Sequence, residues 1–172
     1  MRITGFDPII GAHPRILVLG SMPGRRSLEL GQYYGHARNA FWQIMGDLGL
    51  CKIEDTYEFR LQSLADAGVA LWDVLGGCDR DGSLDADIVA GSEEVNPLEQ
   101  LLMEYPTIRA VIYNGAKAEA LFRRHILPGL SKKRSSAIAS LRLPSTSPAH
   151  AIPYDDKLRA WREIMPFLEQ ER

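Results

Sequence analysis

Short apolar runs separated by segments with helical spacing constrain the fold of this chain most strongly. Residues 15–20 (RILVLG) and 69–74 (VALWDV) are largely apolar and have the length of a buried strand. Residues 108–113 repeat this pattern, and residues 136–143 repeat it more weakly. The pattern predicts four strands that are covered on both faces, as in a parallel sheet.

Helical patterns lie between and after these runs, and they cover residues 40–48, 57–67, 97–105, 117–125 and 155–169. In the last of them Asp155 lies near the predicted N-cap and Trp161 is expected in the core. Residues 79–91 are polar and contain glycine, which predicts a loop. Strands that alternate with helices predict an α/β fold with helices on both faces of a parallel sheet.

Length and composition limit the class of protein. The chain has 172 residues, of which 45% are hydrophobic and 24% are charged, so we expect one globular domain spanning residues 1–172. No apolar stretch is long enough to span a membrane and the N-terminus has no signal-peptide pattern, so we expect a cytoplasmic protein without membrane contact. Cys51 and Cys78 lack CxxC spacing and are expected to be reduced thiols.

Charge is uneven along the chain, although the net charge is only −2. Residues 79–104 contain eight acidic side chains against one arginine, and residues 117–142 contain seven basic side chains against one glutamate. Taken alone, such runs favour two solvated surfaces. The alternative interpretation is a basic face that attracts phosphate.

Ligands of parallel α/β folds bind at the carboxyl ends of the strands, and the first such end carries a small-residue turn. Gly20, Ser21, Met22 and Pro23, followed by a further glycine, set a tight turn that lets a ligand approach the backbone closely. The segment contains neither the G-x-G-x-x-G pattern of dinucleotide sites nor the G-K-[ST] of a phosphate-binding loop.

Residues 33–42 (YYGHARNAFW) are unusually aromatic and precede or open a helix. Phe41 and Trp42 begin the apolar face of that helix and are expected in the core. Tyr34 and Asn39 have polar ends at the predicted mouth of the site, and an aromatic ring there can stack on a nucleobase.

The fourth strand is followed by a loop rich in proline and hydroxyl groups. Two prolines stiffen it, and three hydroxyl side chains are expected to point outward, where they can bind phosphate together with backbone N–H groups. The residues concerned are Pro144, Ser145, Thr146 and Ser147, with the basic Lys132, Lys133 and Arg134 expected close to them.

These segments together resemble the uracil-DNA glycosylase superfamily, and most closely its hypoxanthine-DNA glycosylase branch. The resemblance rests on residues 19–24, 33–42, 68–74, 113–118 and 143–148, which occur in the family's order. It implies a three-layer α/β/α sandwich with a central four-stranded parallel sheet. It also implies hydrolysis of the N-glycosidic bond of deaminated bases in DNA, without a metal or an organic cofactor.

The resemblance assigns roles to individual residues. The general family has a catalytic Asp or Asn in the first loop, where this chain has Ser21 and Met22; the branch uses an Asn that corresponds to Asn39. Its base-stacking aromatic corresponds to Tyr34, and Asn114 is the candidate for contact with the base edge. The loop that enters the minor groove corresponds to residues 145–147. Ala37 and His150 stand where the family usually has Pro and Asn; His150 is grouped with the DNA contacts.

We therefore expect a monofunctional DNA glycosylase of base excision repair that flips hypoxanthine, or secondarily uracil, out of double-stranded DNA, with single-stranded DNA as a further substrate. The protein is expected to be a monomer without a metal, since its histidines lack ligand spacing. Alternatives are a uracil or thymine mismatch glycosylase, and a non-catalytic nucleic-acid or nucleotide-binding domain of the same fold. His36 is expected to cap a turn or to support Asn39, and Asp73 to fix a loop or to face the base.

Overall fold

Four short apolar strands pair in parallel at the centre of the molecule. The computed structural model describes residues 1–169, and the sheet order is β3-β2-β6-β7. The strands are β2 (Ile16–Gly20), β3 (Val69–Asp73), β6 (Ala110–Asn114) and β7 (Ala139–Leu143). All four predicted strands are confirmed. The last one starts three residues later than predicted because helix α6 (Lys132–Ala137) occupies the beginning of that segment.

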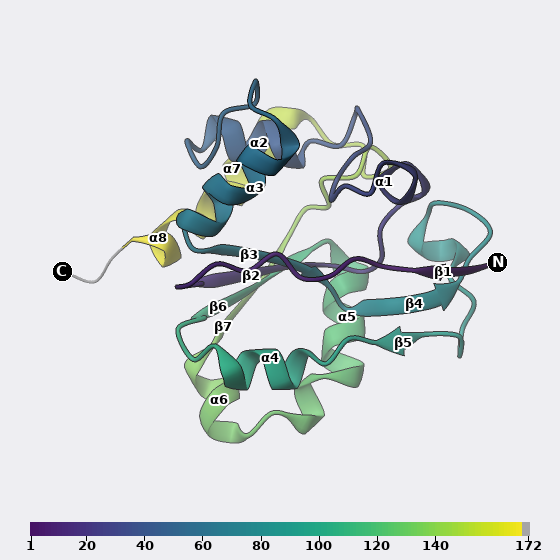
Figure 1. Ribbon diagram of the computed structural model, residues 1–172. Coiled ribbons are helices and arrows are strands. Elements are labelled where there is room, and N and C mark those ends of the chain that lie inside the picture. Colours follow the sequence, from purple (N-terminus) through teal and green to yellow (C-terminus); the bar gives the residue numbers. More distant parts are fainter. Residues whose placement is uncertain (170–172) are drawn as a thin grey trace.

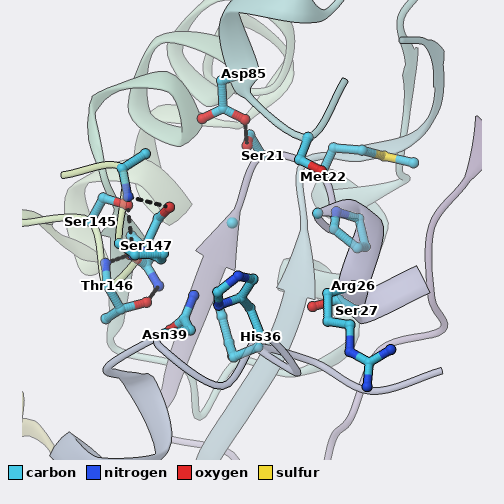
Figure 2. Close-up of a pocket in the computed structure, with 18 of the residues that line it drawn as sticks. Ser21, Met22, Arg26, Ser27, His36, Asn39, Asp85, Ser145, Thr146 and Ser147 are labelled. Atoms are coloured by element: carbon cyan, nitrogen blue, oxygen red, sulfur yellow. Dashed lines mark hydrogen bonds between the residues drawn. The ribbon is translucent and has the colours of Figure 1, made fainter. Parts of the chain in front are cut away.

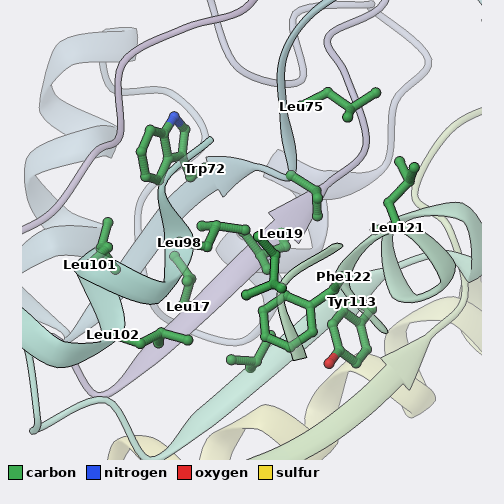
Figure 3. Packing of buried hydrophobic residues seen from close by; sticks show 14 of the residues in the cluster. Leu17, Leu19, Trp72, Leu75, Leu98, Leu101, Leu102, Tyr113, Leu121 and Phe122 are labelled. Atoms are coloured by element: carbon green, nitrogen blue, oxygen red, sulfur yellow. The ribbon is translucent and has the colours of Figure 1, made fainter. Parts of the chain in front are cut away.

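Each face of the sheet has its own hydrophobic cluster because successive strand residues point to opposite sides. Leu17 and Leu19 of β2 pack with helices α4 (Leu98–Glu104) and α5 (Ala116–His125), and Figure 3 shows this cluster around Tyr113 and Phe122. Ile16 and Val18 pack on the other face with helices α2 (Phe41–Asp47), α3 (Tyr57–Asp66) and α7 (Tyr154–Trp161). The two helical layers above and below the sheet in Figure 1 confirm the α/β/α sandwich.

The C-terminal helix is interrupted where a single helix is predicted. Helix α7 is followed by a 3₁₀ turn (Arg162–Ile164) and the short helix α8 (Met165–Leu168). Pro166 has no N–H to donate to the preceding turn, which explains the break. Pro153 takes the N-cap position, so Asp155 lies in the first turn of α7. Trp161 is fully buried, as predicted.

A second, antiparallel sheet was not predicted. Strand β4 (Leu75–Asp79) pairs with β1 (Arg2–Thr4) and β5 (Glu94–Val95), and it continues the chain directly beyond β3. These strands are too short, and β4 too rich in glycine, to give a strand pattern in the sequence. The sheet carries the predicted loop, which contains one 3₁₀ turn (Asp85–Asp87), to the side of the first strand-end turn. There Arg25 of helix α1 (Arg25–Leu30) donates to the Asp81 carbonyl at 2.9 Å.

The cysteines and the helix lengths can also be compared with the predictions from the sequence. Cys51 and Cys78 are both free thiols, and Cys78 is buried. Within residues 1–169 no helix is both long enough and apolar enough to cross a membrane.

Candidate active site

A cavity of about 670 Å³ opens at the carboxyl ends of the four parallel strands. Its walls come from the turn after β2, the aromatic segment before α2, the end of β3, the end of β6 and the loop after β7 (Figure 2). The predicted site residues that line it are Gly20, Ser21, Met22, Pro23, Tyr34, Asn39, Asn114, Ser145, Thr146, Ser147 and His150. The structure thus brings the amide of Asn39 and the hydroxyl-rich loop into one cavity, as expected.

Asn39 is held at the start of helix α2. Its side-chain Oδ1 accepts a hydrogen bond from the backbone N–H of Phe41 at 3.0 Å. The next residue, Ala40, donates its N–H to the Thr146 carbonyl at 3.0 Å, so this segment is tied to the loop after β7. The bond to Phe41 orients the amide plane, and the Nδ2 group has no protein partner within the described residues.

Tyr34 has an unusual backbone conformation, with φ of 54°, that turns its ring into the wall of the cavity. One face of the ring stacks on Phe41, with ring centroids 4.0 Å apart. A base can therefore stack only against the opposite face. The hydroxyl of Tyr34 is buried and has no hydrogen-bond partner among residues 1–169. Burial, and then the nearby Asp73 carboxyl, raise the pKa of this hydroxyl, and the Asn114 amide beside it opposes the rise.

Asn114 holds a loop rather than presenting its whole amide to the cavity. Its Nδ2 donates to the Thr146 hydroxyl at 3.0 Å, and its Oδ1 accepts from the Thr146 N–H at 2.9 Å. One N–H of the side chain remains for other contacts. A glycine is required beside it, since Gly115 has φ of 94° and a Cβ there would lie 3.1 Å from Ser145 Cβ.

The loop after β7 is fastened at several points. Trp161 Nε1 donates to the Pro144 carbonyl at 2.9 Å, and Lys157 Nζ donates to the Ser147 carbonyl at 3.0 Å. Thr146 is 1% exposed, so the prediction that all three hydroxyls point outward is wrong for this residue. The inward turn follows from the two bonds to Asn114. Ser145 and Ser147 remain half-buried at the cavity wall, and the described lining does not include Pro144.

The basic run 132–134 does not lie beside this loop, which corrects the sequence expectation. Helix α6 precedes β7 and the loop follows it, so the two lie at opposite ends of a five-residue strand, roughly 16 Å apart. Arg134 donates to the backbone carbonyls of Leu102, Tyr105 and Ile108 and so fixes the far edge of the sheet. Lys132 and Lys133 are exposed at that same end.

Other arginines, which the sequence pattern did not predict as site residues, lie at the cavity. Arg25, Arg26 and Arg38 belong to its lining and are exposed. Their positions directly after the first strand-end turn and inside the aromatic segment were the available signal. His36 is also exposed, and its Nδ1 accepts from the Arg38 N–H at 3.0 Å, so this histidine caps a turn.

Two carboxyl groups line the cavity as well. Asp73, at the end of β3, is 4% exposed, and its Oδ2 is buried without a partner in the part of the chain that the structure describes. Burial raises the pKa of this carboxyl to about 7; the Asp85 carboxylate adds to the effect and the Arg80 guanidinium opposes it. Asp85 accepts a hydrogen bond from the Ser21 hydroxyl. Only the tertiary structure brings Asp85 here, because it lies in a loop without a motif.

Comparison with known proteins gives the family. The family model described as "Uracil DNA glycosylase superfamily" matches residues 8–169. A hypoxanthine DNA glycosylase of Methanosarcina barkeri is 37% identical over 119 residues, 69% of this chain and 74% of the relative. A protein of the same name from Methanosarcina acetivorans is 36% identical over 115 residues, 66% of this chain and 72% of the relative.

A solved structure agrees over the full length. The solution NMR structure of a candidate uracil DNA glycosylase from Methanosarcina acetivorans superposes with a TM-score of 0.79 at 29% identity, and it covers 99% of this chain and 100% of that chain. Because the family model matches nearly every residue and the backbone agreement runs from end to end, this chain belongs to the uracil DNA glycosylase superfamily.

Proposed function

We propose that the protein is a monofunctional DNA glycosylase that hydrolyses the N-glycosidic bond of hypoxanthine, and secondarily of uracil, in double-stranded DNA. The observation that carries the proposal is the shared cavity of Asn39 and the loop with Ser145 and Ser147. Its volume of about 670 Å³ is ample for a flipped nucleoside. The two curated relatives bear the name hypoxanthine DNA glycosylase, which supports this choice of base.

Flipping the target nucleotide costs a few kcal/mol, and the cost is least at a mispair. Stacking on the face of Tyr34 that Phe41 does not cover would offset part of it, at about 1–3 kcal/mol per base. Ser145 and Ser147, together with the backbone N–H groups of their loop, would bind the flanking phosphates. The exposed arginines Arg25, Arg26 and Arg38 at the rim supply attraction to the DNA backbone, and single strands would bind by the same contacts.

Bond cleavage builds positive charge on the sugar and negative charge on the departing base. Asn39 is neutral and acts by position: its Oδ1 accepts from Phe41 and has a second lone pair that can align a water against the sugar carbon. The turn at residues 20–24 lines the same cavity, and the backbone N–H groups of its non-proline residues can stabilise the base as it leaves. Water is the nucleophile, because the described lining contains no lysine amine that could form a Schiff base.

The experiment is base release from duplexes that contain hypoxanthine, uracil, xanthine or thymine opposite each partner base. We expect wild type to release hypoxanthine fastest, and Asn39→Ala to lower the single-turnover rate at least about 100-fold while DNA binding stays within about threefold. Asn39→Ser is the matched variant, because its hydroxyl can still accept from the Phe41 N–H. It should fold like wild type and yet be slow.

The alternatives predict other results. A mismatch glycosylase would release uracil or thymine and spare hypoxanthine. A non-catalytic binder would retain DNA and release no base at all. Wild-type rates in Asn39→Ala would show that this amide has no part in the reaction. We also propose that the protein acts as a monomer in the cytoplasm, and sedimentation of the free protein and its DNA complex tests the first point.

A further inference from the structure

Two buried polar groups without partners belong to residues that line the cavity close to Gly20. They are Oδ2 of Asp73 and the hydroxyl of Tyr34, neither of which has a hydrogen-bond partner among residues 1–169. A Cβ placed on Gly20 would overlap Oδ1 of Asp73 and lie 3.7 Å from the Tyr34 hydroxyl, so both side chains lie close to Gly20. Buried polar groups in native proteins are almost always paired, and an unpaired set in a cavity indicates a missing polar ligand.

The carboxyl of Asp73 is held in place by the backbone around it. The Val74 N–H donates to the Gly20 carbonyl at 2.9 Å, and Asn96 Nδ2 donates to the Asp73 carbonyl at 2.8 Å. These bonds fix the end of β3 against the end of β2. The side chain therefore projects over Gly20 into the same cavity that Asn39 and Tyr34 line.

We propose that Asp73, in its carboxylic acid form, is the catalytic acid that gives a proton to the departing base. This inference rests on the proposed function, since it assigns the group that acts at the base end of the same bond. Asn39 serves the sugar end and cannot supply a proton to the base. The first turn, with Ser21 and Met22, has no acid that could do so.

The surroundings of Asp73 keep its proton available near neutral pH. Burial raises its pKa to about 7, the Asp85 carboxylate in the same lining contributes to this rise, and the buried Arg80 opposes both. Tyr33 and Tyr34 are the remaining titratable neighbours, and both stay neutral because burial raises their pKa values. A general acid is most effective when its pKa lies near the working pH.

The chemistry balances without a cofactor. As the bond between C1′ and the base nitrogen breaks, its electron pair moves to the base, and the Asp73 proton moves to a ring nitrogen or to O6 of the oxopurine. Water adds its oxygen to C1′ and loses a proton, which returns the Asp73 carboxylate to the acid by way of solvent. The sum is water plus the nucleotide giving a neutral free base and an abasic sugar.

The test compares single-turnover release of hypoxanthine by wild type and Asp73→Asn from about pH 5 to about pH 9. The wild-type rate should fall about tenfold per pH unit above the Asp73 pKa of about 7. Asp73→Asn retains a similar shape but has no transferable proton, so we expect a loss of at least about 100-fold at acidic pH and no alkaline decline. Asp66→Asn, the same exchange at an exposed site on α3, should match wild type.

A second substrate separates proton donation from a role in folding. 5-Fluorouracil leaves more easily as an anion than uracil does, so the deficit of Asp73→Asn should be smaller for it than for uracil. A variant that is merely misfolded would be equally slow on both. Carbon-13 NMR of the aspartate carboxyls, with Asp73→Asn for assignment, should show one group in the free protein that titrates near pH 7.

The outcomes are distinct. Titration of Asp73 near its ordinary pKa, or an alkaline decline that survives in Asp73→Asn, would overturn the inference while the glycosylase activity stands. An inactive wild-type protein would contradict the proposed function, and with it this inference.

Discussion

The carboxyl of Asp73 destabilises the native state, because it is buried and one of its oxygens has no hydrogen-bond partner within the described chain. A buried polar group without a partner costs about 1–3 kcal/mol. The native state retains this cost because the strand ends hold the residue there. The same residue that the reaction uses therefore lowers the stability of the fold.

Asp73→Asn should make the protein more stable at alkaline pH. The native pKa of about 7 lies above the unfolded value of 3.8, so the native state binds the proton more tightly. The free energy of unfolding therefore falls as pH rises from about 4 to about 7 and then levels off. The variant lacks this loss. A difference of about three pKa units corresponds to roughly 4 kcal/mol, so the stability of the variant relative to wild type should rise by about that amount between pH 4 and pH 8. Thermal melts of both proteins across this range check it, and parallel curves would contradict it.

Gly20→Ala should displace the Asp73 side chain, which packs against Gly20. The new methyl group would overlap Oδ1 of Asp73, and a well-packed strand end cannot move away without cost. We expect a destabilisation of about 1–3 kcal/mol and a loss of base release of at least about tenfold. Denaturant titration and single-turnover assays measure the two effects. Gly49→Ala has nothing within 4 Å of its new methyl group, so its cost comes only from its positive φ and leaves the cavity intact.

At the scale of elements, the loop after β7 is fastened to β6, to α7 and to the segment before α2. Asn114 binds Thr146 twice, Trp161 binds the Pro144 carbonyl, and Ala40 binds the Thr146 carbonyl. Preorganised loops bind without the entropic cost of ordering at the time of binding. The loop therefore meets DNA in one shape, with Ser145 and Ser147 at the cavity and Thr146 turned inward.

Asn114→Ala should loosen this loop. It removes two hydrogen bonds and leaves the Thr146 N–H and hydroxyl without partners, so we expect a loss of stability of about 1–3 kcal/mol. Hydrogen exchange at the Thr146 amide should accelerate, and binding to a duplex with an abasic site should weaken about tenfold. Lys157→Met, which removes one bond to the Ser147 carbonyl and keeps a side chain of similar length, should have a smaller effect. Unchanged protection of Thr146 would show that the loop is fixed by other contacts.

At the scale of the whole molecule, the basic run 132–134 does not lie at the cavity, although the sequence led us to expect it there. Helix α6 with Lys132 and Lys133 lies at the end of the sheet away from the cavity, and Arg142 lies within 3.6 Å of Glu119. The acidic segment instead approaches the cavity through Asp85. The attraction for DNA at the mouth comes from arginines near the N-terminus.

Arg26→Ala and Arg38→Ala should each weaken DNA binding several-fold and reduce the slope of log K against log salt concentration by about 1. Lys132→Ala and Lys133→Ala should leave both quantities unchanged, because those side chains lie at the far end of β7. Fluorescence anisotropy with a duplex containing an abasic site, over a range of salt concentrations, makes the comparison. A smaller slope in the lysine variants would show that the DNA reaches around to α6.

The local pattern of the sequence determined the four parallel strands and the loops that follow them. Continuous apolar runs of five or six residues, glycine or asparagine at strand ends, and proline after β7 act through neighbouring residues, so they can be recognised without coordinates. The lining of the cavity by Tyr34, Asn39 and Ser145 followed from the same rule. The glycine-rich strand β4 and the 3₁₀ turn at Asp85 had no such pattern, and they were missed.

The tertiary structure alone decided which side chains of the site are bound by other protein groups and which remain available to a ligand. Thr146 turns inward because Asn114, 32 residues earlier in the chain, binds it. Asp73 is buried without a partner within residues 1–169, and Asp85 and the rim arginines join it, because strand order and the second sheet bring these segments to one edge. Hydrogen bonds and burial between distant segments depend on that order, which the local pattern of a single sequence does not contain.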